Sequence, residues 1–381
     1  MRKIKVFFQN LFRWETLLFF LVFFSNFAIG SFLLTDILYL LFAAYLMIKY
    51  PPRNDKIMWA VGIFILIGLC NILRFPFSRG SMSMLRFIYN LTIFVMIYLC
   101  INKRNLRSKA IEGYIFACCI FSIVVVIQFA LFYGIGINLK IDFGEFGREV
   151  NAASGYSVLD AVLYRTGGLF KEPSWYAAFC APVCFLLTVL DKKKELVLCL
   201  LGLVLSTSSL AFMVLAIYIV WVILRYNTKL GILATFVMAG VYYFFPIIFS
   251  RLIGSESAGS KSFDVRIAGA SDFITSNNVI SVIGIDPSIL YNHDGTPVFF
   301  CNTMSFIYLF FGVLGLALFL KLIYFRSNIF LTISIASIMI AEGLYGRIDF
   351  WMMLLACKLF NDYFIDINSK AKLKMQKYVK R

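Results

Sequence analysis

The stretch GYIFACCIFSIVVVIQFALFY, from Gly113 to Tyr133, contains no aspartate, glutamate, lysine or arginine. A helix of this length spans about 30 Å, which is the thickness of the hydrocarbon core of a bilayer. Similar stretches recur along the whole chain of 381 residues, of which 61% are hydrophobic and only 15% are charged. Because so few charges could not cover a soluble domain of this size, the sequence predicts an integral membrane protein.

Apolar stretches of sufficient length occur at twelve places, several of them short, so the sequence predicts an all-α, polytopic transmembrane bundle of about 10–12 spans. They cover residues 16–34, 36–50, 57–73, 84–101, 113–133, 174–190, 195–208, 209–224, 229–249, 302–324, 328–343 and 350–366. The first is too long for a signal-peptide core and is expected to remain as a helix. The residues from Ser206 to Ser209 could instead interrupt a single broken helix.

Basic residues gather in every second short connection between these stretches. They are Arg2, Lys3, Lys5 and Arg13 before the first stretch, then Lys49, Arg53, Lys56, Lys103, Arg104, Arg107, Lys109, Lys192, Lys193, Lys194, Arg225, Lys229, Lys321 and Arg326, with more in the tail from Lys370 to Arg381. Because basic connections stay in the cytoplasm, both termini are expected there. This membrane anchoring explains the net charge of +16 without a nucleic acid partner.

The chain is expected to divide into three helical blocks separated by two long loops on the outer side. Residues 1–133 form the N-terminal helices, 174–249 the central helices and 302–366 the C-terminal helices, before a basic tail of residues 367–381. The loops are residues 134–173 and 250–301. Connections of this length in a compact protein are usually functional or disordered, which makes the loops the expected place of a site.

Cysteine positions argue against a disulfide framework. Of the nine cysteines, only Cys301 lies at the mouth of a span, and the other eight lie inside apolar stretches. Because cysteine behaves as a small hydrophobic residue in such surroundings, we expect no structural disulfide and no zinc site.

Arginine and lysine are distributed differently under this topology. The outer side holds three of the 20 lysines but eight of the 16 arginines: Arg74, Arg79, Arg86, Arg148, Arg165, Arg251, Arg266 and Arg347. A guanidinium group matches the geometry of phosphate oxygens better than an ammonium group. The pattern therefore favours a phosphate-bearing ligand at the outer membrane face. The alternative is that these arginines pair with anionic lipid headgroups or with nearby acids such as Asp142, Glu145, Glu149, Asp264 and Asp349.

The most distinctive string is Arg165-Thr-Gly-Gly-Leu-Phe-Lys-Glu-Pro-Ser174, which closes the first loop and runs into a span. Gly167 and Gly168 free the backbone for a close approach to a ligand. Pro173 and Ser174 are typical of a helix start, with Glu172 near its positive N-terminal end. A plain helix-end charge or an ion-pair partner is the alternative role of Glu172.

This string resembles the Arg-x-x-Gly-Leu/Phe-Phe-x-Glu-Pro-like string of the O-antigen polymerase/O-antigen ligase superfamily, the Wzy-like enzymes. A second string, Leu205-Ser-Thr-Ser208, is similar to the Leu-Ser-x-Ser segment that the family often carries one span later. The resemblance covers about residues 165–320 together with the overall topology.

Two further strings follow in the family's order. Arg266 and the later Val282-Ile-Gly-Ile-Asp286 resemble the arginine and Gly-x-Gly element of the second loop, with Asp286 in place of the second glycine. Cys301-Asn302-Thr303, with Gly312 and Gly315 after it, resembles the string that opens a late span. A histidine common in the ligase branch is replaced by Cys301.

The resemblance implies a polymerase of O-antigen or capsule, a glycosyltransferase whose site faces outward from the bacterial inner membrane. It would transfer a growing glycan from its polyprenyl diphosphate carrier onto the next lipid-linked repeat unit. Arginines, rather than a metal ion or a cofactor, are expected to stabilise the departing diphosphate. A chain-length regulator and a flippase of the same pathway are further expected partners.

Candidate residues follow from this chemistry. Arg165 and Arg266, one from each loop, are the expected catalytic cations, and Glu172 and His293 are candidate bases for the acceptor hydroxyl. Residues expected to bind substrate are Arg74, Arg79, Arg86, Gly168, Lys171, Pro173, Ser174 and Asn302.

Two other functions stay open from the sequence. An O-antigen ligase would move finished glycan onto lipid A core, but the missing histidine before Asn302 favours the polymerase. A flippase for lipid-linked oligosaccharides should carry charges in the middle of its spans. Here the interiors of the spans are nearly free of charge, with Lys358 the clearest exception, which favours chemistry at the outer surface.

Overall fold

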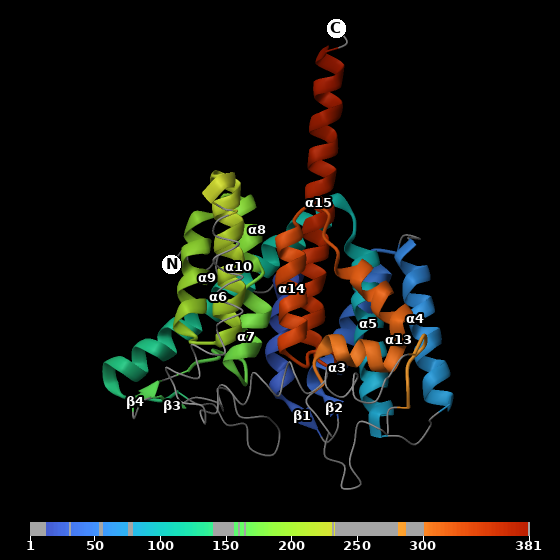
Figure 1. Cartoon of the computed structure of the whole chain (residues 1–381), viewed down its shortest axis with the longest axis horizontal. Coiled ribbons are helices and arrows are strands. Elements are labelled where there is room, and N and C mark those ends of the chain that lie inside the picture. Colours follow the sequence, from blue (N-terminus) through green and yellow to red (C-terminus); the bar gives the residue numbers. More distant parts are fainter. Residues whose placement is uncertain are drawn as a thin grey trace.

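The structure is a computed structural model of the chain (Figure 1). It describes residues 13–29, 32–52, 56–74, 79–139, 156–158, 161–163, 165–230, 232, 281–286 and 301–379. Within these ranges only the backbone is described for residues 28–29, 32, 56–60, 79–81, 104, 156–158, 161–163 and 368–379.

The described part is predominantly helical. Its helices are α2 (Trp14–Phe20), α3 (Leu34–Lys49), α4 (Lys56–Arg74), α5 (Arg79–Ile101), α6 (Arg104–Ile135), α7 (Pro173–Cys180), α8 (Val183–Val189), α9 (Lys193–Leu205), α10 (Ser209–Tyr226), α13 (Thr303–Ile323), α14 (Ile329–Ala341), α15 (Ile348–Val379) and the 3-10 helix η1 (Leu21–Asn26). Two small antiparallel hairpins join β1 (Ala28–Ile29) to β2 (Phe32–Leu33) and β3 (Tyr156–Val158) to β4 (Ala161–Leu163).

Four helices in the described part are long and apolar enough to cross a membrane: Met82–Ile101 within α5, Asn105–Ile135 within α6, Ser209–Tyr226 and Thr303–Ile323. Shorter apolar helices lie at Trp14–Asn26, Val61–Arg74, Pro173–Val189 and Ile329–Ala341. These features agree with the predicted helical membrane protein. The total of about 10–12 spans and the sidedness of the loops stay predictions, since most of residues 229–301 lie outside the described part.

The first apolar stretch differs from its prediction. A single helix over residues 16–34 is wrong, because α2 passes into η1 and the chain then turns through the hairpin of β1 and β2. Asn26 explains the turn: its buried side-chain amide donates to the carbonyls of Phe23 and Leu169, at 2.8 Å each. A helix continuing through Asn26 would carry this polar side chain away from both acceptors.

Two further apolar stretches are divided. Pro182 lies between α7 and α8, where its ring cannot continue the helical hydrogen bonds. Thr207 adopts a left-handed backbone with φ of 51° between α9 and α10, so these are separate helices. The interruption predicted around Ser206 to Ser209 is confirmed, and it separates two helices.

The interior combines aliphatic and aromatic side chains, and the largest of the fully buried ones are aromatic. Helix α6 packs against α2, α9 and α15. Trp351 of α15 is fully buried, and its ring lies 5.2 Å from that of Phe87 on α5. Phe87 in turn contacts Phe311 of α13, at 4.9 Å between ring centroids. These contacts bring the N-terminal and C-terminal helical blocks into one apolar core.

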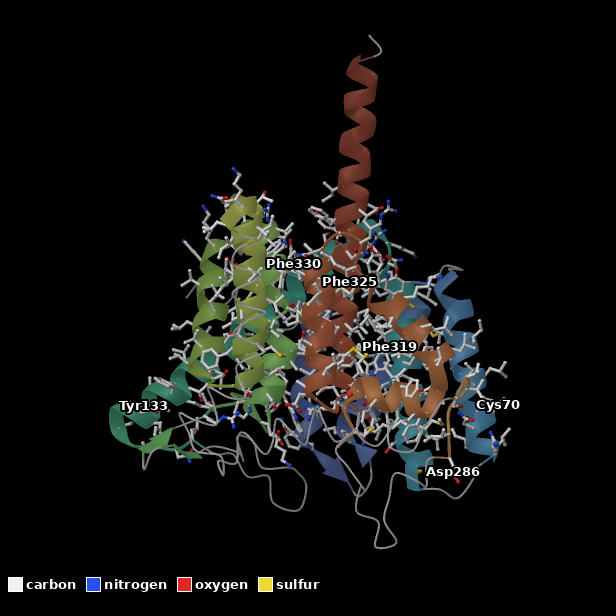
Figure 2. All side chains as sticks on the ribbon, in the orientation of Figure 1. Cys70, Tyr133, Asp286, Phe319, Phe325 and Phe330 are labelled. Atoms are coloured by element: carbon white, nitrogen blue, oxygen red, sulfur yellow. The ribbon has the colours of Figure 1, made fainter. Side chains whose placement is uncertain are left out.

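The bundle has two distinct ends. One, called the motif end, is where α7 begins at Pro173 and α15 begins at Ile348, near the hairpin of β1 and β2 (Figure 1). The other, called the basic end, is where α9 begins at Lys193 and α10 ends at Tyr226. Figure 2 places Asp286 toward the motif end, and Phe325 and Phe330 toward the basic end.

Helix α13 is interrupted at Gly312, whose φ of 68° and ψ of −169° are not helical. Residues 281–286, from the second long loop, fill the interruption. The backbone N–H of Ile285 donates to Leu309 O at 2.8 Å, and the N–H of Val313 donates to Ser281 O at 3.0 Å. Backbone groups that a kink would leave open in an apolar surrounding are thereby satisfied.

The side chain of Asn71 on α4 joins this interruption. Its amide donates to the carbonyls of Ile283, at 2.6 Å, and Phe310, at 2.7 Å. Gly284 is required here, because its φ is 103° and an added Cβ would lie 2.3 Å from Phe310 O. The resemblance motifs around Gly284 and Gly312 are therefore in direct contact.

Candidate functional site

The distinctive string of the first loop forms a tight turn held against α6. Gly168 has a φ of 65°, and an added Cβ would lie 2.9 Å from a methyl group of Val125. Gln128 of α6 donates to Gly168 O at 3.0 Å and accepts a bond from the Thr166 hydroxyl. Because Gln128 and Thr166 are fully buried, these polar bonds fix the turn in an otherwise apolar setting.

Apolar contacts complete the anchoring of this turn. Phe170 is 3% exposed and packs against Phe121 of α6 and Phe179 of α7, with ring centroids 5.2 and 5.7 Å apart. Leu169 O accepts from Asn26, as described above. The turn therefore joins η1, α6 and α7.

The predicted helix start after this turn is confirmed. Glu172 is the N-cap residue of α7 and Pro173 occupies its first turn, where a missing N–H is harmless. The Ser174 hydroxyl lies 3.5 Å from Glu172 Oε2. This start places Trp175, the next residue, at the motif end of the bundle.

Trp175 is the meeting point of two cationic side chains. The guanidinium carbon of Arg347 lies 3.0 Å from the centroid of its ring, and Lys171 Nζ lies 5.9 Å from it. Arg347 also holds Asp349 through both Nε, at 3.0 Å, and Nη2, at 2.5 Å. With only 14% of the Arg347 side chain exposed, the guanidinium plane is fixed by a carboxylate and an aromatic face together.

Arg347 owes its position to the connection between α14 and α15. Thr303 accepts a bond from the N–H of Leu344 and donates to Glu342 O, at 2.8 and 2.7 Å. Tyr345 stacks on Phe306 of α13 with ring centroids 3.8 Å apart and planes 2° apart. These contacts tie the connection to the start of α13.

A second arginine approaches from α5. Arg86 Nη2 lies 3.3 Å from Asp36 Oδ2 on α3, and Gly346 leaves room for its aliphatic stem. Tyr89, one turn further along α5, donates its hydroxyl to the backbone carbonyl of Asp36. Asp36 is itself positioned by the first turn of α3, where Leu33 N–H donates to its carboxylate at 3.0 Å.

Arg86, which pairs with Asp36, and the Arg347–Asp349 pair line one pocket of about 60 Å³ at the motif end. Its lining residues are Ser25, Leu33, Arg86, Gly346, Arg347, Ile348 and Asp349. Arg86 Nε and Asp36 Oδ1 are buried without a hydrogen-bond partner in the part of the chain that the structure describes. The spare donor on the guanidinium group of Arg86 suits an anion with several oxygens, such as a phosphate.

The structure brings some of the predicted residues together at the motif end, and their roles stay predictions. Arg86 lines the pocket. The ammonium group of Lys171 lies over the ring of Trp175, which the guanidinium group of Arg347 also contacts. The predicted alternative, pairing of outer arginines with acids, also holds, since Asp349 pairs with Arg347 and Asp36 with Arg86. The pocket is therefore a charge-balanced cluster rather than an isolated group of cations.

Other predicted residues lie elsewhere. Gly168, Pro173 and Ser174 shape the turn and the start of α7, and Asn302 is the N-cap of α13, accepting a bond from Ser305 N–H at 2.8 Å. Arg165 is half-buried at the start of the turn, while Arg74 ends α4 at an exposed position.

Three predicted residues cannot be placed at side-chain level. Arg79 begins α5, but only its backbone is described, and Arg266 and His293 lie outside the described residues. The expected convergence of Arg165 and Arg266 therefore stays a prediction.

Cys301 lies two residues before α13, where the resemblance stated above would lead one to expect a histidine in a ligase. Burial raises the pKa of its thiol to about 12. The thiol is therefore protonated at neutral pH and does not replace a histidine base. Within the described residues, no group of three or more histidine, cysteine, aspartate or glutamate side chains forms a metal site.

Sequence reasoning did not single out Asp36, Arg347 or Asp349 as site residues. The available signal was an acid flanked by apolar residues between the first two stretches, and the short string Arg347-Ile-Asp349 between the last two. Charges isolated in this way at span ends are costly unless paired, so they are natural candidates for partners.

No protein family model, no curated protein and no solved structure matches this chain. The site is therefore interpreted from its own residues.

Proposed function

We infer that the chain is a glycosyltransferase that polymerises a lipid-linked polysaccharide. The single observation that carries this proposal is the meeting of Arg86, Arg347 and Lys171 around the pocket and Trp175 at the motif end. The string that supplies Lys171 and Trp175 is also the one that resembles the polymerase superfamily. An anionic substrate of phosphate type with an attached sugar fits both features.

In the proposed reaction an acceptor hydroxyl attacks the anomeric carbon of the glycan bound to polyprenyl diphosphate. A carbon–oxygen bond forms to the acceptor while the bond to the diphosphate breaks, and the diphosphate leaves with the bonding electrons. Arg86 and Arg347 stabilise the negative charge that develops on the leaving group. Their carboxylate partners hold both guanidinium planes in place before the substrate arrives, which lowers the cost of reorganisation.

The acceptor hydroxyl must lose a proton in this step. Glu172 is the candidate base among the described residues, because its side chain is half-buried at the start of α7, next to the residues that support Trp175. The indole ring of Trp175, which is only partly buried, is of the kind on which a sugar ring stacks.

The test is a gene deletion complemented with variants and read on a polysaccharide gel. We expect the deletion to leave one repeat unit per chain, and the intact gene to restore a ladder of lengths. Arg347→Lys should fail to restore long chains although the protein reaches the membrane, since lysine offers neither the bidentate pairing with Asp349 nor the planar stacking on Trp175.

Lys193→Gln is the matched control, because Lys193 is an exposed cation at the basic end. It should restore the full ladder. A deletion that yields core without any attached glycan would identify a ligase instead. A normal ladder from Arg347→Lys would remove this arginine from the mechanism.

A further inference from the structure

A second cavity, of about 240 Å³, lies at the basic end, opposite the candidate site. It is enclosed by residues of α8, α10, α15 and the connection before α14, and its polar and aromatic lining consists of Trp221, Arg225, Ser327, Asn328, Phe360 and Phe364. The proposed transferase chemistry at the motif end makes no use of it.

Asn328 presents a buried donor to this cavity. Its side-chain oxygen accepts bonds from Phe330 N–H and Leu331 N–H, at 3.0 and 3.2 Å, and so caps α14. This bonding fixes the amide, whose Nδ2 has no partner within the described part although the residue is only 8% exposed. A buried N–H of this kind calls for an acceptor.

Ser327 provides a second donor beside it. Its hydroxyl oxygen is buried and has no hydrogen-bond partner among the described residues. The backbone N–H of Ser327 donates to Asn361 Oδ1 on α15 at 3.0 Å, which holds the connection against that helix. Both side chains therefore line a pre-formed wall at the positive N-terminal end of α14.

Arg225 supplies the cation. Its guanidinium carbon lies 5.6 Å from the centroid of the Trp221 ring, and no carboxylate of the described residues pairs with it. The acids of this part of α15 are engaged elsewhere: Asp362 accepts from the Tyr98 hydroxyl at 2.5 Å, and Asp366 pairs with Arg107 at 2.9 Å. The cavity thus combines one unneutralised cation with neutral donors.

We propose that this cavity binds the phosphate group of an anionic membrane lipid. The phosphate oxygens accept from Arg225, Ser327 and Asn328, and the rings of Trp221, Phe360 and Phe364 contact the apolar part of the lipid. A basic pocket between helices at one end of an apolar bundle is suited to a headgroup, because the acyl chains remain in the bilayer.

The experiment measures lipid binding to the purified, delipidated full-length chain by native mass spectrometry. Phosphatidylglycerol and phosphatidylcholine with the same acyl chains are titrated in parallel. We expect one phosphatidylglycerol to bind about tenfold more tightly than phosphatidylcholine, because its headgroup carries no compensating cation. Equal binding of the two lipids would overturn the proposal.

Three variants sharpen the test. Arg225→Gln removes the cation, and Asn328→Asp keeps the cap of α14 but replaces the donor with an anionic oxygen; each should remove the preference for phosphatidylglycerol. Arg326→Gln is the matched control, because Arg326 is exposed in the same connection and does not line the cavity, and it should bind as the unaltered chain does. Retention of the preference in both Arg225→Gln and Asn328→Asp would overturn the assignment to this cavity.

Soluble glycerol phosphate separates the two sources of a phosphate group. If it fails to displace phosphatidylglycerol at millimolar concentration, the lipid assignment is supported. If it displaces the lipid from the unaltered chain but not from Arg225→Gln, the cavity takes a soluble phosphate and the lipid assignment is wrong.

Discussion

Arg347 and Arg86 illustrate what single residues reveal in this protein. Each guanidinium is held by an aspartate, yet the two pairs differ in sequence separation: Asp349 is two positions from Arg347, whereas Asp36 is 50 positions from Arg86. From the sequence alone, Asp349 was one of several acids with which the outer arginines could pair, and it was not assigned to Arg347. The second pair depends on the packing of α3 against α5 and could not be read from local pattern.

A prediction at this scale concerns Cys301. Because the pKa of its thiol is raised to about 12, the thiol stays protonated throughout the neutral range and loses its proton only at strongly alkaline pH. Cys301→Ser should therefore retain transferase activity, with an unchanged pH profile between about pH 6 and pH 8. The measurement is glycan ladder formation in membranes across that range.

The result would be contradicted by a folded Cys301→Ser protein that has lost its activity, since that outcome requires a thiolate. A variant that fails to reach the membrane would be replaced by Cys301→Ala, which is also close to the size of cysteine.

At the scale of elements, hydropathy located the long helices well. Residues 57–73 and 302–324 were predicted as spans, and the structure has α4 at Lys56–Arg74 and α13 at Thr303–Ile323. The agreement has a physical basis, because long uncharged segments in lipid must satisfy their own backbone hydrogen bonds. Interruptions of helices were harder to predict from local pattern. Asn26 donates to Leu169 O, more than a hundred positions away, and the interruption at Gly312 is filled by residues 281–286 of the second loop.

Gly312 gives the prediction at this scale. Gly312→Ala should lower the free energy of unfolding of the detergent-solubilised protein by about 2–4 kcal/mol, and with it the melting temperature. The left-handed backbone at this position and a Cβ 2.3 Å from Val282 O are both unfavourable for alanine. The measurement is the melting temperature followed by intrinsic fluorescence.

Gly62→Ala in α4 is its control, because nothing lies within 4 Å of the added methyl group. It should be neutral or slightly stabilising. Equal melting temperatures for Gly312→Ala and Gly62→Ala would show that residues 281–286 do not pack against α13 as described.

At the scale of the whole molecule, the two cavities lie at opposite ends of one helical bundle. The pocket at the motif end is lined by Arg86 and by the Arg347–Asp349 pair, and the cavity at the basic end has one unneutralised arginine. The proposed reaction therefore requires its lipid-linked substrate in the leaflet at the motif end, and the proposed lipid site requires an anionic lipid in the leaflet at the basic end. Only the sidedness of the chain decides which leaflet serves which end.

Reporter fusions test that sidedness. Alkaline phosphatase inserted after Asn138, near the start of the first loop, should be active, since the enzyme folds only outside the cytoplasm. The same enzyme inserted between Lys192 and Lys193 should be silent, because basic connections stay inside. Activity at the lysines and silence at Asn138 would reverse the orientation and place the motif end in the cytoplasm.

Residues 281–286 come before α13 along the chain, so they leave the ribosome earlier than Gly312 does. When the second half of α13 enters the bilayer, the segment that supplies its missing backbone partners is already available. A translation product cut before residue 281 and supplied with α13 as a separate piece would lack this order of arrival. We therefore expect insertion of the two halves of α13 to depend on synthesis of the loop segment that precedes them.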